Sequence, residues 1–521
     1  MTENAPEPLV DDYREPILVA DDIGFASAGP DEITGQTSGH TGGFRTAILG
    51  MVGDSAQYLV GLALLSVANV VLVPLYTRKI TPAQFGVYAL IDISVLGLLT
   101  VASLGLNVAY LKWFAEAKPS EIPALFSDML LPGCAAASIL GLTFSLLLLS
   151  PLGARWFGMP TREFAWILLP IVFTENLETL LLAHLRALRR SMAFCGASAA
   201  RLVAVVGASV WYLSVQHRGL TGVFLGRAVG DVVGVSVLIA MCAGAFRISC
   251  SWTKISGMTR FGVPLVFSAL MATMLDASGR YFLSHYGSLA EVGMYGLGTK
   301  LSGLMRVLIV APFGVAWGGV MFQIAREKNA RAIYSKLLCY VFLVGVVAAV
   351  IMDLFTPALL TIFATPAYFG ARRIVSLLLL TQAVGMLQYP ASVGIYLKGF
   401  TRVFTLIYGG AFLLDLAMNR LLVPRYGIVG AAFSWLIAWS ALVLATAIVS
   451  QFLYPLHYEA KPFLLAAMGC AAAFLFRRAG ISAVTVGGIA YTACFSLLVV
   501  AVVGWFIVAD FKATALRLEA E

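Results

Sequence analysis

The chain has 521 residues, of which 60% are hydrophobic and only 12% are charged. A soluble globular domain carries about 25% charged residues, so this composition excludes an ordinary water-facing surface. Uncharged stretches at 129–154, 374–397 and 426–456 reach or exceed the roughly 20 residues that a helix needs to cross a bilayer. The sequence therefore predicts a polytopic membrane protein.

Residues 1–44 differ in composition from the rest of the chain. They hold nine acidic side chains against a single arginine, Arg14, which predicts a disordered acidic tail. The tail lacks the basic start and apolar core of a cleavable signal peptide. The remaining residues hold 34 basic and 18 acidic side chains, a net charge of +16, whereas the whole chain carries +8.

Hydropathy predicts fourteen membrane-spanning helices and an all-α fold, because a backbone in lipid must satisfy its own hydrogen bonds. We expect the spans at 54–76, 86–109, 124–150, 163–184, 194–215, 219–245, 261–284, 290–320, 336–356, 371–395, 402–422, 427–453, 462–476 and 480–508. With both termini in the cytoplasm, the inner segments hold 19 lysines and arginines and the outer segments 12. This bias favours cytoplasmic termini, and we expect a bacterial inner-membrane protein.

Three sequence phrases recur at a nearly constant offset. Thr81-Pro82-Ala83-Gln84 and Ser288-Leu289-Ala290-Glu291 are both capping boxes, which mark helix starts. The residues that follow match at an offset of 207, since GVYAL (86–90) answers GMYGL (293–297). HLRALRR (184–190) resembles YLKGFTR (396–402), and RGLTGVFLG (218–226) resembles YGIVGAAFS (426–434).

This repeat predicts two six-helix lobes. Because six is an even number, the lobes have the same orientation and are related by a pseudo-two-fold axis along the membrane normal. The expected domains are the cytoplasmic tail 1–44, an N-lobe 45–250, a C-lobe 251–455, and a segment 456–521 with the last two helices and a cytoplasmic C-terminus. Two parallel lobes with a cleft between them suit alternating-access transport.

The segment VPLYTRKITPAQFGVYALIDISVLGLLTVASLGLNVAYLKWF (73–114) resembles the opening of prokaryotic polysaccharide transporters, the Wzx-type oligosaccharide flippases. The likeness extends over residues 50 to about 455. It implies the fold of the multidrug/oligosaccharidyl-lipid/polysaccharide exporter superfamily. It also implies a lipid-linked oligosaccharide as cargo, carried on polyprenyl pyrophosphate to the outer leaflet, with a polysaccharide polymerase and chain-length machinery as partners. The acidic tail departs from the family pattern.

Ionisable side chains within spans are the candidates for function, because a charge at mid-bilayer costs about 2.5–3.5 kcal/mol unless it meets water or a partner. They are Asp92, Glu175, Glu178, Arg201, Arg227, Asp231, Asp276, Arg280, Lys300, Arg306, Asp353 and Asp415.

Some of these charges have a structural explanation. Arg227 with Asp231, and Asp276 with Arg280, are four residues apart and can pair on one helix face. Lys300 and Arg306 have no acidic residue within four positions. We therefore expect these two, with Arg201 and Arg280, to bind an anionic substrate, since arginine and lysine suit a pyrophosphate.

Asp92 and Lys300 occupy nearly equivalent positions in the two lobes. At the offset of 207, Asp92 corresponds to Thr299, the residue directly before Lys300. We hypothesise that they attract each other across the cleft and that an anionic headgroup competes for Lys300. The alternative is that Asp92 only bonds a neighbouring Thr or Tyr. Tyr88 and Tyr295 are candidate sugar contacts.

Gating and coupling are assigned to five charged residues within the spans, Asp92, Arg227, Asp231, Asp276 and Asp415. No P-loop motif is present, which disfavours direct ATP drive, and we expect no cofactor. Exchange of protons or sodium ions and the membrane potential remain alternative energy sources. The seven cysteines are scattered and form no metal-binding motif, and nothing indicates a nucleic-acid partner.

Three other functions compete with the flippase. A drug or metabolite exporter of the same fold would be expected to present acidic groups to cationic drugs, whereas the basic excess favours an anionic cargo. A lipid II-type flippase shares the same fold and charge pattern. A membrane polysaccharide polymerase or ligase would need an external catalytic surface, but the predicted outer loops are short and the five histidines are dispersed. The sequence therefore indicates a transporter rather than an enzyme.

Overall fold

The computed structural model describes residues 71–157, 161–247, 249–327, 329–456 and 486–520. These residues form helices and turns without a strand, as the hydropathy predicts. Eleven helical stretches among them are long and apolar enough to cross a membrane. They correspond to twelve of the predicted spans, because one stretch joins two of them. The predicted spans 54–76 (for the most part) and 462–476 lie outside the described residues.

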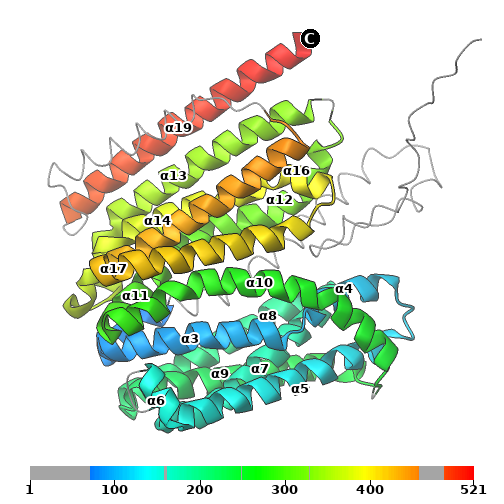
Figure 1. The fold of residues 1–521 in the computed structure, drawn as a ribbon, viewed down its shortest axis with the longest axis vertical. Coiled ribbons are helices and arrows are strands. Elements are labelled where there is room, and N and C mark those ends of the chain that lie inside the picture. The colour runs from blue at the N-terminus through cyan, green and yellow to red at the C-terminus, as the bar shows by residue number, and fades with distance from the viewer. Residues whose placement is uncertain (1–70, 158–160, 248, 328, 457–485, 521) are drawn as a thin grey trace, which may run out of the picture.

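The described part of the N-lobe contains helices α2 to α9. Its helices are α2 (Val73–Lys79), α3 (Pro82–Ala102), α4 (Leu106–Glu116), α5 (Ile122–Leu149), α6 (Pro151–Phe157), α7 (Arg162–Ala187), α8 (Ser191–Val210) with η2 (Trp211–Val215), and α9 (Gly219–Cys242) with η3 (Ala243–Ala245). In Figure 1 they form the lower half of the molecule, where α5, α7, α8 and α9 pack closely.

The C-lobe contains helices α10 to α17. Its helices are α10 (Trp252–Tyr286), α11 (Leu289–Met305) with η4 (Arg306–Val310), α12 (Ala311–Ile324), α13 (Ala330–Phe363), η5 (Pro366–Ala371), α14 (Arg372–Met386), α15 (Gln388–Ala391), α16 (Val393–Leu397) and α17 (Arg402–Leu453). They form the upper half of Figure 1, and α19 (Val486–Ala520) lies at its edge beside α13.

Helix boundaries differ from the predicted spans where a helix continues beyond its most apolar part. Helix α10 begins nine residues before the predicted span, and α13 runs from Ala330 to Phe363, against a predicted 336–356. Hydropathy marks the lipid-embedded part of a helix, whereas backbone hydrogen bonds continue into the polar interface. The predicted boundary between 422 and 427 falls inside α17, where Gly427 adopts a left-handed φ of 53° and makes a sharp kink.

Both predicted capping boxes are present. The Thr81 side chain accepts a hydrogen bond from the backbone N–H of Gln84, and Ser288 does the same for Glu291. The two helices that start here, α3 and α11, cross each other between the lobes. The sequence repeat therefore marks the two helices that bring the lobes together.

The crossing of α3 and α11 depends on two equivalent glycines, Gly86 and Gly293. A Cβ atom added at Gly86 would lie 2.0 Å from the Leu289 carbonyl oxygen, and one added at Gly293 would lie 2.0 Å from the Pro82 carbonyl oxygen. Pro82 and Leu289 are themselves 207 residues apart, so the contact is reciprocal and follows the repeat. We call this contact the first glycine crossing.

A second glycine crossing joins α4 to α10. Gly105 has a φ of +67°, and an added Cβ would lie 2.5 Å from the Gly262 carbonyl oxygen. Gly105 follows Gly86 by 19 residues, which corresponds to about 29 Å along a helix at 1.5 Å per residue. The two crossings therefore hold the lobes together at two levels, and the charged residues of α3 and α11 lie between them.

Candidate functional site

Arg227 of α9 is held by two carboxylates from other helices. Its Nε and Nη2 atoms donate to the two carboxylate oxygens of Glu175 on α7 at 2.7 and 2.8 Å. Its Nη1 atom donates to Asp92 Oδ1 on α3 at 2.9 Å. This geometry uses the planar fork of the guanidinium, so the arginine fixes three helices relative to one another.

Arg201 of α8 meets three carboxylates. It donates to Asp231 Oδ1 at 2.7 and 2.9 Å and to Glu175 Oε1 at 3.2 Å, and its Nε lies 3.1 Å from Glu178 Oε2. The expected pairing of Arg227 with Asp231 is therefore wrong: Asp231 bonds to Arg201 and Arg227 bonds elsewhere. Tertiary packing brings better-oriented partners to both side chains than the i,i+4 geometry offers.

Lys300 of α11 reaches across to the N-lobe. Its Nζ atom lies 3.5 Å from Asp92 Oδ2 and 5.2 Å from the centre of the Tyr88 ring. The structure thus contains the Asp92–Lys300 contact that the repeat leads us to expect. At 3.5 Å this ion pair is longer than the Arg227–Asp92 contact, so Lys300 is the more loosely held of the two cations on Asp92.

Two further C-lobe cations have weak or uncharged partners. Arg280 on α10 donates to the Thr299 hydroxyl at 2.9 Å, and within the described residues no carboxylate lies within 4 Å of its guanidinium nitrogens. Arg306 Nη1 lies 3.7 Å from Asp276 Oδ2. The expected Asp276–Arg280 pairing is therefore wrong.

Asp276 finds its remaining partners on α17. Its Oδ1 atom accepts hydrogen bonds from the indole nitrogens of Trp435 at 3.0 Å and Trp439 at 3.4 Å. These partners are 159 and 163 residues away, so a search for charges along one helix face could not have found them.

Several of these charges remain accessible although they lie within long apolar helices. The side-chain exposure is 64% for Arg306, 30% for Asp92 and 26% for Asp276. Arg306 is also the first residue of the π-helical turn η4. Such turns are frequent at functional sites. A charged group within a span requires water or a partner, and Arg306 has a single carboxylate contact, at 3.7 Å.

Asp415 of α17 has a different environment. Its Oδ2 atom accepts hydrogen bonds from Ser278 and from Asn419 Nδ2, the latter at 2.9 Å. The Oδ1 atoms of Asp415 and Asn419 are buried and have no hydrogen-bond partner among the described residues. These two unpartnered oxygens belong to buried residues one helical turn apart.

The two tyrosines predicted as sugar contacts belong to the core instead. Tyr88 is 4% exposed and packs against Phe85, and Tyr295 is 2% exposed with its hydroxyl beside Gly279. Neither ring is available to a ligand in this conformation. Tyrosine at a helix entry serves helix packing here, which a sequence pattern does not distinguish from ligand binding.

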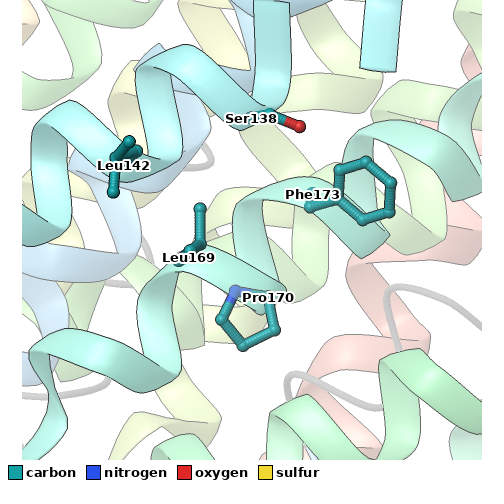
Figure 2. A pocket seen from close by; sticks show the side chains of 5 residues that line it. All are labelled: Ser138, Leu142, Leu169, Pro170 and Phe173. Atoms are coloured by element: carbon teal, nitrogen blue, oxygen red, sulfur yellow. The ribbon is translucent and has the colours of Figure 1, made fainter. Parts of the chain in front are cut away.

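A cavity of about 370 Å³ lies elsewhere, between α5 and α7. Figure 2 shows its lining, which consists of Ser138, Leu142, Leu169, Pro170 and Phe173. None of the charged candidates contributes to it, and its surface is almost entirely apolar. It is therefore not the site for an anionic group.

Comparison with known families identifies residues 52–325, more than half of the chain, with the model for "Polysaccharide biosynthesis protein". The chain belongs to this family. Comparison with curated proteins found no match. Family membership agrees with the resemblance seen in residues 73–114.

Solved structures show the same fold. A structure described as "Lipid II flippase MurJ, inward closed conformation" is 10% identical, with a TM-score of 0.73 over 88% of this chain and 100% of that one. An inward-facing multidrug resistance MATE family transporter of the MOP superfamily is 14% identical, with a TM-score of 0.61 over 76% of this chain and 94% of that one. This polysaccharide biosynthesis family member is thus a multi-pass membrane protein with the fold of these transporters.

Proposed function

We propose that this protein is a flippase that moves polyprenyl-pyrophosphate-linked oligosaccharide from the cytoplasmic to the outer leaflet for surface polysaccharide biosynthesis. Family membership and fold support a transporter in such a pathway. The observation that carries the proposal is the loosely held Lys300–Asp92 ion pair between the lobes. An anionic group that enters there can displace the carboxylate and bind the lysine.

The contact distances of the cations support an anion site on the C-lobe. The N-lobe arginines Arg201 and Arg227 are saturated by carboxylates at 2.7–3.2 Å. Lys300 and Arg306 have carboxylate contacts of 3.5 and 3.7 Å, and Arg280 contacts a hydroxyl. Thus Lys300, Arg280 and Arg306 are the groups that would bind a pyrophosphate, whereas Arg201 holds the N-lobe network.

The two glycine crossings would serve as gates for alternating access. With both termini in the cytoplasm, as the loop charges favour, the first crossing lies at the outer face and the second at the inner face. The outer end carries additional contacts between the lobes: Thr77 donates to the Phe363 carbonyl at 2.7 Å, and Tyr368 donates to the Ile80 carbonyl at 2.8 Å. Outward release of cargo would require these bonds and the first crossing to open.

Asp92 and Arg227 link cargo binding to the helices of the N-lobe, so we assign them a gating role. Asp415, with its neighbour Asn419, is the candidate coupling site of the C-lobe. Its orphaned oxygens suit a sodium ion, a hard cation that prefers oxygen ligands, or a proton. Asp276, whose carboxylate is bound by two indoles and Arg306, would respond to cargo through Arg306.

Two alternatives concern the cargo. A lipid II-type flippase would use the same cations, because its cargo also carries a pyrophosphate. A cationic-drug exporter is disfavoured, since the loosely held charges of the site are basic. Downstream partners would be the polysaccharide polymerase and chain-length machinery of a bacterial inner membrane.

The test is flipping by the purified protein in liposomes, with a pyrophosphate-linked oligosaccharide whose exposure outside is read by a glycosidase. We expect Lys300→Ala to abolish flux, Lys300→Arg to retain part of it, and Asp92→Asn to slow it. Lys254→Ala is a matched control, because Lys254 also forms an ion pair, at 3.1 Å, but an exposed one with Glu121. Wild-type flux in both Lys300→Ala and Asp92→Asn would refute the proposal.

A further inference from the structure

The N-lobe charge network ends in two carboxylates that depend on one arginine. Glu178 Oε2 lies 3.1 Å from Arg201 Nε, and Asp231 Oδ1 accepts from the same guanidinium at 2.7 and 2.9 Å. Within the described residues neither carboxylate forms another ion pair. Glu178 is 5% exposed and Asp231 is fully buried, and Asp231 Oδ2 has no hydrogen-bond partner there.

Negative charge exceeds positive charge along this network. Its contacts run from Lys300 through Asp92, Arg227 and Glu175 to Arg201 and its two terminal carboxylates. Among the residues joined by these ion pairs, four carboxylates face three cations. Arg280 adds positive charge only at the Asp92 end, so the shortage of positive charge lies at the Arg201 end, where water has little access. Two carboxylates that share one site do not both ionise readily, because each disfavours the charge on the other.

We infer that Glu178 and Asp231 share one proton and form a proton-binding site inside the N-lobe. The charged groups that act on them from the surrounding helices are Glu175 of α7, Arg201 of α8 and Arg227 of α9. Asp92 and Tyr88 of α3, Lys300 of α11 and Arg280 of α10 lie further along, around Asp92. One bound proton brings the summed charge of the ion-paired residues to zero. The proton comes from water and occupies a carboxylate oxygen, and no other bond changes.

Cargo binding would alter the proton content of this network, a consequence that rests on the proposed function. When an anionic group binds Lys300, Asp92 loses one of its two ion pairs. Its remaining ion pair, with Arg227, then becomes stronger. Glu175 then shares Arg227 less and Arg201 more, which leaves the terminal carboxylates less compensated. The network therefore takes up a second proton as the pyrophosphate binds, and by linkage the anion binds more tightly at lower pH.

Infrared spectroscopy of the resting protein at neutral pH tests the proton site without any ligand. A neutral carboxyl group has a carbonyl stretch that is resolved from that of a carboxylate. We expect this signal in the wild type and a loss of one carboxyl group's intensity in both Asp231→Asn and Glu178→Gln, because either change leaves Arg201 one terminal carboxylate fewer. Difference spectra against the wild type cancel any other neutral carboxyl group, such as Asp415. Glu121→Gln, at an exposed ion pair, should retain it. Loss in neither variant, or in only one of them, would overturn the shared proton.

Titration calorimetry with farnesyl pyrophosphate in buffers of different ionisation enthalpy tests the linkage. We expect the wild type to take up about one more proton per bound ligand than Asp92→Asn. In that variant residue 92 has no carboxylate to lose its cation when the ligand binds Lys300. An uptake of one proton corresponds to a change of up to about tenfold in Kd per pH unit. Protonation of the ligand itself is common to both proteins and cancels. Equal uptake in both would overturn the linkage. Absence of binding to both would refute the anionic cargo, and the infrared result would still decide the proton site.

Discussion

The first glycine crossing provides the sharpest prediction, because the substitution Gly293→Ala adds a single methyl group at a point of backbone contact. The new Cβ would lie 2.0 Å from the Pro82 carbonyl oxygen, and ordinary van der Waals contact begins at 3.4 Å. Helices α3 and α11 must separate by more than 1 Å to accept it. Overpacking of this kind costs about 1–3 kcal/mol, which corresponds to roughly 5- to 150-fold in the population of the closed crossing.

The closed crossing can be measured by disulfide formation between Thr77→Cys and Thr365→Cys in a protein whose seven native cysteines are replaced. The Thr365 hydroxyl lies 3.4 Å from the Thr77 carbonyl oxygen, so this pair reports contact between the lobes near the crossing. We expect Gly293→Ala to lower the cross-linking rate at least fivefold. Gly303→Ala on the same helix should leave it unchanged, because an added Cβ there meets no atom within 4 Å.

The repeat makes this prediction reciprocal. An added Cβ at Gly86 would also lie 2.0 Å from a carbonyl oxygen, so Gly86→Ala and Gly293→Ala should lower the rate by similar factors. If Gly86→Ala and Gly293→Ala both cross-link as fast as the control Gly303→Ala, the crossing accommodates a methyl group. The reasoning from close backbone approach would then be wrong.

Three further predictions concern the charged residues. Arg227→Gln should lower the free energy of unfolding by about 3–5 kcal/mol, measured as a lower Tm, because Glu175 loses both hydrogen bonds of its bidentate pair. Arg227→Lys should not recover the wild-type Tm, since lysine lacks the planar fork. Arg306→Gln should raise the KM for transport while Tm stays within about 2 °C, because this exposed arginine has one long contact; an equal effect of Lys254→Gln would contradict this. If Asp415 binds sodium, Na⁺ should raise the Tm of the wild type but not of Asp415→Asn; an equal rise in both would exclude that site.

Composition and local motifs were enough to predict the fold. The apolar stretches predicted membrane helices, the two capping boxes predicted the starts of α3 and α11, and the repeat predicted two lobes of similar construction. These signals are local, since helix formation and membrane insertion depend on residues within about one span of each other. The same repeat led to Asp92 and Lys300, because equivalent positions in two related lobes face a common axis.

The partners of the charged residues could not be derived in the same way. Asp231 lies four residues from Arg227, yet it pairs with Arg201, 30 residues away, and Arg227 pairs with Glu175, 52 residues away. The tyrosines Tyr88 and Tyr295 looked like ligand contacts but are buried. A residue's position along one helix limits which neighbours it can have but does not determine which other helices pack beside it.

The sequence by itself determined that the chain spans a membrane, that it contains two related lobes and that basic charge is placed within its spans. Only the tertiary structure decided which of those cations are already neutralised and which remain available. The physical reason is that burial and ion pairing depend on distances across helix interfaces, where a 2.7 Å contact and a 3.5 Å contact differ in strength although the residue types are the same.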